Sequence, residues 1–178
     1  MASRRARPPL DQQRLSELAL RYVGRFATTR ARLRAYLERK IRERGWDGPR
    51  PPDVGAIADR FAELGYVDDA GYALAKSRAL SGRGYGKRRV TEALRVAGIA
   101  DEDGAAAQAH AESKRVAAAL RFAEKRRIGP FAEPGSRDPR QHDKALAAMV
   151  RAGHPFDLAL TILSLPPGEP FDLNEFSA

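Results

Sequence analysis

The sequence predicts an all-helical protein, built as an elongated array of three tandem three-helix repeats. Apolar residues recur with the 3.6-residue period of a helix, and no segment alternates with the period of two that a β-strand shows. Glycines that end such stripes recur at Gly45, Gly98 and Gly153, 53 and 55 residues apart. Units of this size bury their apolar faces only by sharing cores with their neighbours, which favours a stacked array. Two unrelated helical subdomains are the alternative.

The first repeat is expected to contain three helices, each introduced by a side chain that can accept a hydrogen bond from the first turn. Asp11 introduces the first helix, Thr28 or Thr29 the second, and Asp53 the third. The predicted inner faces are Leu15, Leu18, Ala19, Tyr22 and Phe26, then Leu33, Leu37 and Ile41, then Val54, Ile57, Ala58, Phe61 and Leu64.

The second repeat begins where Gly65 ends one helix and Asp68 introduces the next. Gly86 opens a fifth helix under concentrated positive charge, and Asp101 begins a sixth. From 105 to 127 the sequence is rich in alanine and nearly unbroken. It therefore allows one long helix or two short ones.

Two helices are predicted near the end of the chain. Asp138 and Pro139 open a helix that runs to about Val150, and Pro155 starts the last one. The predicted inner face of the last helix is Phe156, Leu160 and Leu163.

Positive charge is concentrated in the first part of the chain. The 178 residues carry 32 Lys or Arg against 23 Asp or Glu, and residues 1–50 hold 14 of these basic residues against 5 acidic ones. Such an excess is typical of a surface that meets a polyanion or an acidic protein. The alternative is a solvated helix surface with no partner.

Several other classes of protein are disfavoured. The chain has no cysteine, so neither a disulfide nor a thiolate metal site is expected. The basic N-terminus lacks the apolar stretch of a secretory signal, and no window has the roughly 18 apolar residues of a membrane span. The sequence predicts a soluble, cytoplasmic protein.

One glycine-rich segment suggests a nucleotide-binding loop, with Gly82, Gly84 and Gly86 followed by Lys87. A P-loop has four residues between its first glycine and the Gly-Lys pair, then a Ser or Thr that holds magnesium, whereas Arg88 follows here. No predicted strand precedes the segment. A glycine-rich turn between two helices is therefore predicted.

No catalytic, metal or cofactor site is predicted. His110, His142 and His154 lack the spacing and the clustered acids of a metal site. Asp68 and Asp69 are better explained as an N-cap and as a first-turn charge that suits the helix dipole. We expect a protein that is not an enzyme and holds no cofactor.

The predicted binding surface is basic and lies mainly on the second and fifth helices. Arginine can hold a phosphate or a carboxylate with two parallel hydrogen bonds, so repeated basic faces suit a DNA backbone or an acidic protein. Tyr85 is expected either to stack on a base or, in preference, to pack under the turn. The predicted surface residues are Arg32, Arg39, Arg42, Arg83, Tyr85, Lys87, Arg88, Arg89 and Arg95.

The chain resembles the RecX family, bacterial regulators of the RecA recombinase, over about 10–165. The stretches that resemble the family signature are Tyr66-Val67-Asp68-Asp69 and Gly84-Tyr85-Gly86-x-x-Arg89-Val90-x-x-x-Leu94-x-x-x-Gly98-Ile99. The stretches similar to its capped second helix and third repeat are Thr29-x-x-Arg32-Leu33-x-x-x-Leu37, Phe122-Ala123-x-Lys125-Arg126, Lys144-Ala145-Leu146 and Ala152-Gly153-His154. The chain departs from the family at Arg32, where an acid usually completes a capping box.

The resemblance implies three tandem three-helix repeats and a regulator without enzymatic activity. It implies binding to RecA, in the groove of the RecA–DNA filament, and restraint of recombinase, ATPase and co-protease activities in DNA repair and the SOS response. DNA is expected to bind weakly or through the filament, and the chain is expected to be a monomer. The alternative is a stand-alone helical DNA-binding protein or transcription factor.

The predicted organisation has five parts. A basic, flexible N-terminus over 1–9 precedes helical repeats over 10–65, 66–110 and 111–165. A flexible acidic tail is expected over 166–178, where fraying is the usual behaviour of a terminus. Docking of this tail on the repeats, or competition for the basic surface, is the alternative.

Overall fold

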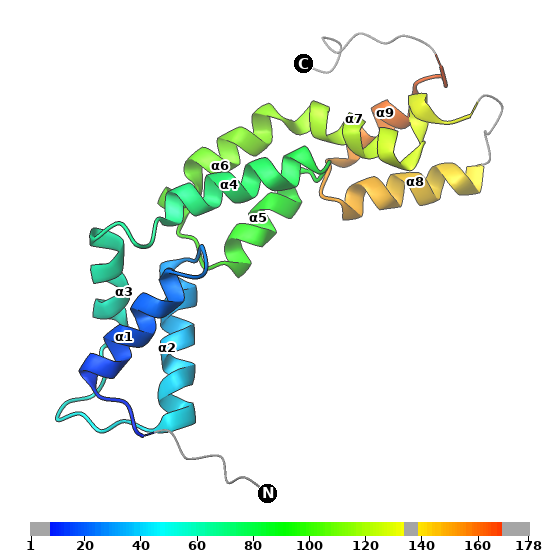
Figure 1. Cartoon of the computed structure of the whole chain (residues 1–178). Coiled ribbons are helices and arrows are strands. Elements are labelled where there is room, and N and C mark those ends of the chain that lie inside the picture. The colour runs from blue at the N-terminus through cyan, green and yellow to red at the C-terminus, as the bar shows by residue number, and fades with distance from the viewer. Residues whose placement is uncertain (1–7, 134–138, 169–178) are drawn as a thin grey trace, which may run out of the picture. The chain divides into compact units, whose positions relative to one another are not determined.

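The computed structural model describes residues 8–133 and 139–168, in which helices are joined by loops and turns (Figure 1). The predicted all-helical class is confirmed, and the described residues hold only one isolated β-bridge, between Leu10 and Trp46. The helices are α1 (Gln12–Val23), α2 (Arg30–Arg44), α3 (Val54–Glu63), α4 (Asp69–Gly82), α5 (Lys87–Val96), α6 (Asp101–Ser113), α7 (Arg115–Arg126), α8 (Pro139–Arg151) and α9 (Phe156–Ser164), with a 3-10 turn over Gly129–Phe131.

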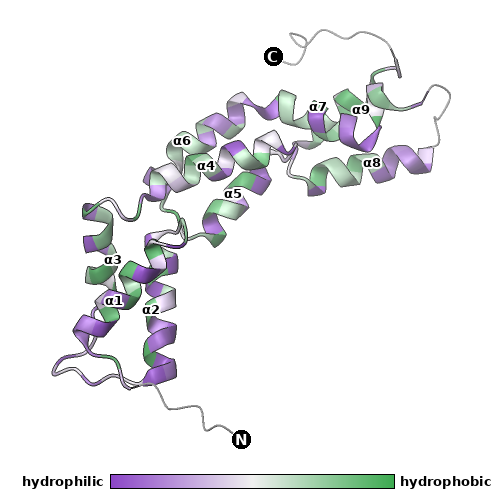
Figure 2. Cartoon of the chain, viewed as in Figure 1, coloured by the Kyte–Doolittle hydropathy of each residue, from purple (hydrophilic) through white to green (hydrophobic). Residues whose placement is uncertain are grey.

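The described residues divide into two compact units. Those up to Tyr72, together with Ala97–Ile99, form unit 1, and the others form unit 2. Figure 2 shows hydrophobic and hydrophilic residues alternating along the helices of both units, as the helical periodicity predicts. The predicted limits of the three repeats remain a prediction, and most of the predicted N-terminus and acidic tail lies outside the described residues.

Unit 1 packs α1, α2 and α3 around one apolar core. The three predicted N-caps are confirmed, since Asp11, Thr29 and Asp53 each accept a hydrogen bond from the backbone N–H three residues later, at 2.8, 3.2 and 2.8 Å. Thr29, rather than Thr28, is therefore the cap of α2. The buried core residues are Leu10, Leu15, Ala19, Leu33, Leu37, Ile57, Ala58 and Val67.

Two residues of the predicted inner faces in unit 1 are exposed. Phe26 is 56% exposed because α1 already ends at Val23, so the helical stripe does not extend to it. Leu64 is 51% exposed because it is the C-cap of α3 rather than part of its last turn. In the sequence, the apolar period therefore continues past the residue at which each helix ends.

In unit 2, the alanine-rich stretch 105–127 belongs to two helices and not to one long helix. α6 ends at Ser113 and α7 begins at Arg115, with Lys114 (φ −102°, ψ 7°) between them. α4 packs against α6, where the buried Ser77 Oγ donates a hydrogen bond to Ala107 O at 2.8 Å.

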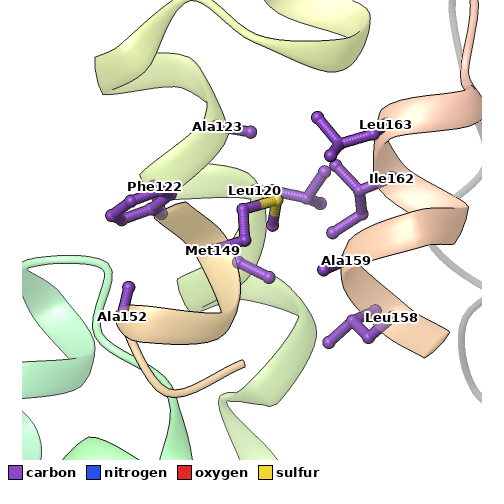
Figure 3. Close-up of a cluster of buried hydrophobic side chains, with 10 residues drawn as sticks. Leu120, Phe122, Ala123, Met149, Ala152, Leu158, Ala159, Ile162 and Leu163 are labelled. Atoms are coloured by element: carbon purple, nitrogen blue, oxygen red, sulfur yellow. The ribbon is translucent and has the colours of Figure 1, made fainter. Parts of the chain in front are cut away.

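The second core lies among α7, α8 and α9 (Figure 3). The predicted inner face of α9 was wrong in two positions, because Phe156 and Leu160 are 60% and 43% exposed. A helix with this many apolar residues carries two candidate stripes, and packing against α7 and α8 selects one of them. The buried residues of α9 are Leu158, Ala159, Ile162 and Leu163.

Candidate functional site

The turn before α5 is held by an unusually close contact between backbones. Gly86 N donates a hydrogen bond to Ala152 O at 3.0 Å, and Arg88 N donates to Gly153 O at 3.2 Å. A Cβ on Gly86 would overlap the Gly153 carbonyl, and a Cβ on Gly153 would overlap the backbone of Arg89. The glycines of the two family-like stretches therefore serve to bring the start of α5 against the turn after α8.

His154 completes this contact from inside. Its ring is fully buried, and Nε2 lies 3.0 Å from Gly84 O. The ring meets that of Phe122 edge-on, with the two ring centres 5.7 Å apart. Burial lowers the pKa of His154, although the Gly84 carbonyl opposes this shift. A neutral imidazole that donates from Nε2 to Gly84 O fits both the lowered pKa and the 3.0 Å contact. We call Gly84, Gly86, Gly153 and His154 the glycine junction.

The glycine junction places the basic start of α5 beside the end of α8. The resulting hollow, here called the α5–α8 groove, has a volume of about 510 Å³. Arg88, Arg89 and Arg151 are exposed in it and form no ion pair with a described acidic residue. The lining residues are Lys87, Arg88, Arg89, Thr91, Glu92, Val150, Arg151 and Gly153.

The N-terminus of α5 is closed by protein backbone. Arg88 N is bonded to Gly153 O, so an anion in the groove would be held by side chains rather than by free helix N–H groups. Three cations in a first turn also oppose the helix dipole, and α5 has no acid there to offset them. The groups that this groove offers to an anion are therefore the exposed guanidinium groups of its arginines.

Two of the predicted basic residues on α5 are neutralised by neighbours. Lys87 Nζ lies 2.8 Å from Glu112 Oε2, and this bond lowers the pKa of Glu112. Arg95 holds Glu92 with two hydrogen bonds at 3.0 and 2.8 Å, which lower the pKa of Glu92. Their charge is already partly balanced within unit 2.

Tyr85 and Arg83 form part of the turn itself. Tyr85 is half-buried and packs against the core of α7, α8 and α9. The exposed Arg83 lies over its ring, with Cζ 5.7 Å from the ring centre. The structure thus places Tyr85 under the turn, which was the preferred of the two expectations.

The predicted residues of unit 1 lie along α2 and have different surroundings. Arg32 is half-buried, and its Nη1 donates to the Tyr72 hydroxyl at 2.6 Å, which accounts for a cation in the first turn. Arg39 lies 3.7 Å from Glu43, whereas the exposed Arg42 has no bonded partner among the described residues. Arg32 therefore has an internal role that its sequence position did not reveal.

Asp69 has a role that the sequence did not indicate. Asp68 is the expected cap, accepting from Gly71 N at 2.8 Å. Asp69 is 7% exposed and accepts from both the backbone N and the Nε of Arg30, at 2.9 and 3.0 Å. The two residues are 39 positions apart, so no local signal identifies the pair.

The described residues show no recognisable catalytic or metal centre. The contact of Ser77 with His110 Nδ1, at 3.0 Å, resembles a nucleophile with its base. Ser77 is fully buried, however, and its proton is donated to Ala107 O. Among these residues there is also no group of three or more potential ligands arranged for a metal ion. No described helix is long and apolar enough to cross a membrane.

Comparison with known proteins gives consistent relatives over most of the chain. The chain is 32% identical over 161 residues to the regulatory protein RecX of Myxococcus xanthus, which covers 86% of each. It is 33% identical over 162 residues to RecX of a Mycobacterium species (strain JLS), covering 88% of this chain and 86% of that one. No family model matches.

A solved structure shares the fold. The crystal structure of RecX from Lactobacillus salivarius superimposes with a TM-score of 0.60 at 18% identity, covering 84% of this chain and 92% of that one. At this identity the likeness concerns the fold alone.

Proposed function

Because the chain belongs to the RecX family, we propose that it binds RecA or the RecA–DNA filament and restrains it. The activities restrained are recombination, ATP hydrolysis and co-protease function, in DNA repair and the SOS response. The protein acts by binding, as a cytoplasmic monomer, rather than by catalysis. Its basic surfaces meet the filament groove, and DNA is contacted weakly or through the filament.

The α5–α8 groove is the observation that supports this proposal most directly. It gathers three exposed arginines that form no ion pair with a described carboxylate, at a place where two of the family-like stretches meet. A cluster of exposed arginines of this kind attracts phosphates or surface carboxylates, and arginine can bind either in bidentate fashion. Because hydrogen bonds hold its backbone, binding has to order the arginine side chains but not the backbone.

The mechanism that we propose is steric and electrostatic. A helical protein that contacts neighbouring protomers of a filament favours the filament state to which it is complementary. Extension of the filament and strand exchange both require the filament to leave that state, so binding of the chain opposes them.

The first experiment measures ATP hydrolysis by RecA of the same organism, stimulated by single-stranded DNA, while the chain is titrated in. We expect inhibition well below one chain per RecA, since a competitor for DNA would need amounts comparable to the DNA sites. Absence of inhibition at equimolar protein would contradict the proposal and favour a stand-alone DNA-binding protein.

Variants test whether the groove carries the effect. Arg88→Ala, Arg89→Ala and Arg151→Ala together are expected to raise the concentration for half-inhibition about tenfold or more, as each lost charged contact contributes roughly 1 kcal/mol. A matched control removes three exposed charges elsewhere, with Arg21→Ala, Arg60→Ala and Arg78→Ala. Equal losses in both variants would show that net charge, and not the groove, is responsible.

A further inference from the structure

A second basic surface surrounds the end of α4, and α7 supplies most of it. Arg121 Nη1 donates to Gly82 O at 2.9 Å, and Lys125 Nζ donates to Arg83 O at 3.3 Å. Gly82 is the last residue of α4 and Arg83 follows it, so both carbonyls lie at the helix end where the dipole is negative. Two cations of α7 therefore cap α4 and cancel the negative potential that would otherwise repel an anion.

Two arginines at the same place are held over aromatic rings. Arg83 lies over Tyr85 at 5.7 Å, and Arg126 lies over Phe122 at 5.4 Å. Phe122 is 9% exposed, and both rings pack in the core of unit 2, so they give the guanidinium groups fixed supports. The Gly84 backbone connects the two pairs, since a Cβ there would lie 3.0 Å from Phe122 N.

In the part of the chain that the structure describes, these cations are not paired with carboxylates. Arg83, Arg121, Lys125 and Arg126 are all exposed, and none of them forms an ion pair with a described carboxylate. The α5–α8 groove differs, because Glu92 lines it and Glu112 binds its lysine. An arginine stacked on an aromatic ring keeps its N–H groups available for an oxygen ligand while losing little freedom on binding.

We propose that Arg83, Arg121, Lys125 and Arg126, the α7 basic surface, bind the phosphate backbone of a nucleic-acid strand. Arg83 and Arg126 contact phosphate oxygens, and Arg121 and Lys125 hold α4 and add positive potential. α7 thus contributes to nucleic-acid binding, although it carries none of the binding-surface residues predicted from the sequence. This inference deepens the DNA contact of the proposed function, but it requires no RecA and is tested without it.

The test measures binding of a dye-labelled 30-nucleotide oligo-dT, and of its duplex with oligo-dA, by fluorescence anisotropy across a range of salt concentrations. Arg83→Gln with Arg126→Gln removes the stacked charges and leaves the caps of α4 intact. For two phosphate contacts on a single strand, the slope of log affinity against log salt should shrink by about 1.4. Affinity at moderate salt should fall about tenfold.

Two further variants separate the surface from net charge and from folding. Arg83→Lys with Arg126→Lys keeps both charges and should retain most of the salt slope. Arg21→Gln with Arg60→Gln removes two exposed charges of unit 1 and should change the slope much less. Circular dichroism of the Gln variant should match that of the unaltered chain, since only exposed side chains change.

The inference is overturned if the Arg83 and Arg126 variant binds both DNA forms with an unchanged salt slope. It is equally overturned if the slope of the unit 1 control shrinks by as much as that of this variant. It is also overturned if the variant loses binding to poly-glutamate but not to DNA, since the surface would then recognise acidic protein. Loss of DNA binding with RecA inhibition intact would leave the α7 basic surface standing. Loss of RecA inhibition with DNA affinity and salt slope unchanged would overturn the α7 basic surface as a DNA site while supporting the proposed function.

Discussion

The two units make the same kind of contact with different chemistry. In unit 2 the Gly86 backbone N–H donates to Ala152 O, just before the left-handed Gly153. In unit 1 the Thr29 hydroxyl donates to Ala97 O at 2.7 Å, just before the left-handed Gly98. In each case the start of one helix is bonded to the alanine carbonyl that precedes a helix-ending glycine.

The difference lies in what surrounds each bond. We call Thr29, Arg30, Asp69, Ala97 and Gly98 the threonine junction, where side chains make the bonds and a buried aspartate adds an ion pair. In the glycine junction the bonds between the start of α5 and the turn after α8 join backbone atoms, and the His154 side chain adds one contact, to Gly84 O. Side chains can shift by a few tenths of an ångström, whereas backbones held by helices cannot, so the glycine junction should be the less tolerant of the two.

The largest effect is expected from Gly153→Ala. The new Cβ would be placed at φ +96° and against the backbone of Arg89, so strain and overlap together should cost about 4 kcal/mol. Gly45→Ala is the matched control, because Gly45 also has positive φ but has no atom near its Cβ position. Gly45 has φ 81° and ψ 167°, a conformation essentially restricted to glycine, so this control should cost about 2 kcal/mol in urea unfolding followed by circular dichroism. Equal costs would mean that backbone strain alone matters at Gly153.

A smaller loss is expected when the threonine junction loses its aspartate. Asp69→Ala removes the buried carboxylate that accepts from the Arg30 backbone N and Nε, and should cost about 2 kcal/mol because the Arg30 side chain is still 34% exposed. Asp68→Ala removes only a helix cap and should cost about 1 kcal/mol. Urea unfolding of both variants gives the comparison, and a larger loss for Asp68 would contradict the assigned roles.

The glycine junction should also weaken in acid. Because burial lowers the pKa of His154 below its ordinary 6.5, the unfolded chain takes up its proton first as pH falls. Stability from this group is therefore complete above about pH 6.5 and declines below it, by at most about 1.4 kcal/mol per pH unit. His154→Gln, which keeps a donor without titrating, should reduce this dependence in urea unfolding between pH 7.5 and 5. An unchanged dependence would assign the acid sensitivity to other groups.

The smallest effect is expected at the end of α5. Arg95→Gln breaks an ion pair with Glu92 in which both side chains are largely in water. The midpoint of urea unfolding should not change measurably, in contrast to both junction variants. A clear shift would show that α5 is stabilised by its surface charges and not by its anchored ends.

Local structure was largely predictable because its signals act within a few residues. The caps at Asp11, Thr29 and Asp53 and the helix-ending glycines at Gly98 and Gly153 were read from the sequence and are present. The candidate site was predictable only in part. Exposed Arg88 and Arg89 came from the charge run, whereas Arg151 joins them only through packing of the turn after α8 against α5.

The sequence by itself determined the helical class, the ends of most helices and the RecX family, since periodicity, capping and motif spacing are properties of neighbouring residues. Tertiary structure alone decided which stripe of α9 is buried, that Asp69 binds Arg30, that Arg32 binds Tyr72, and that α7 meets the Gly84 turn. The last three of these contacts join residues roughly 40 positions apart. Their pairing depends on which apolar faces fit together, and that competition is settled only when the whole core packs.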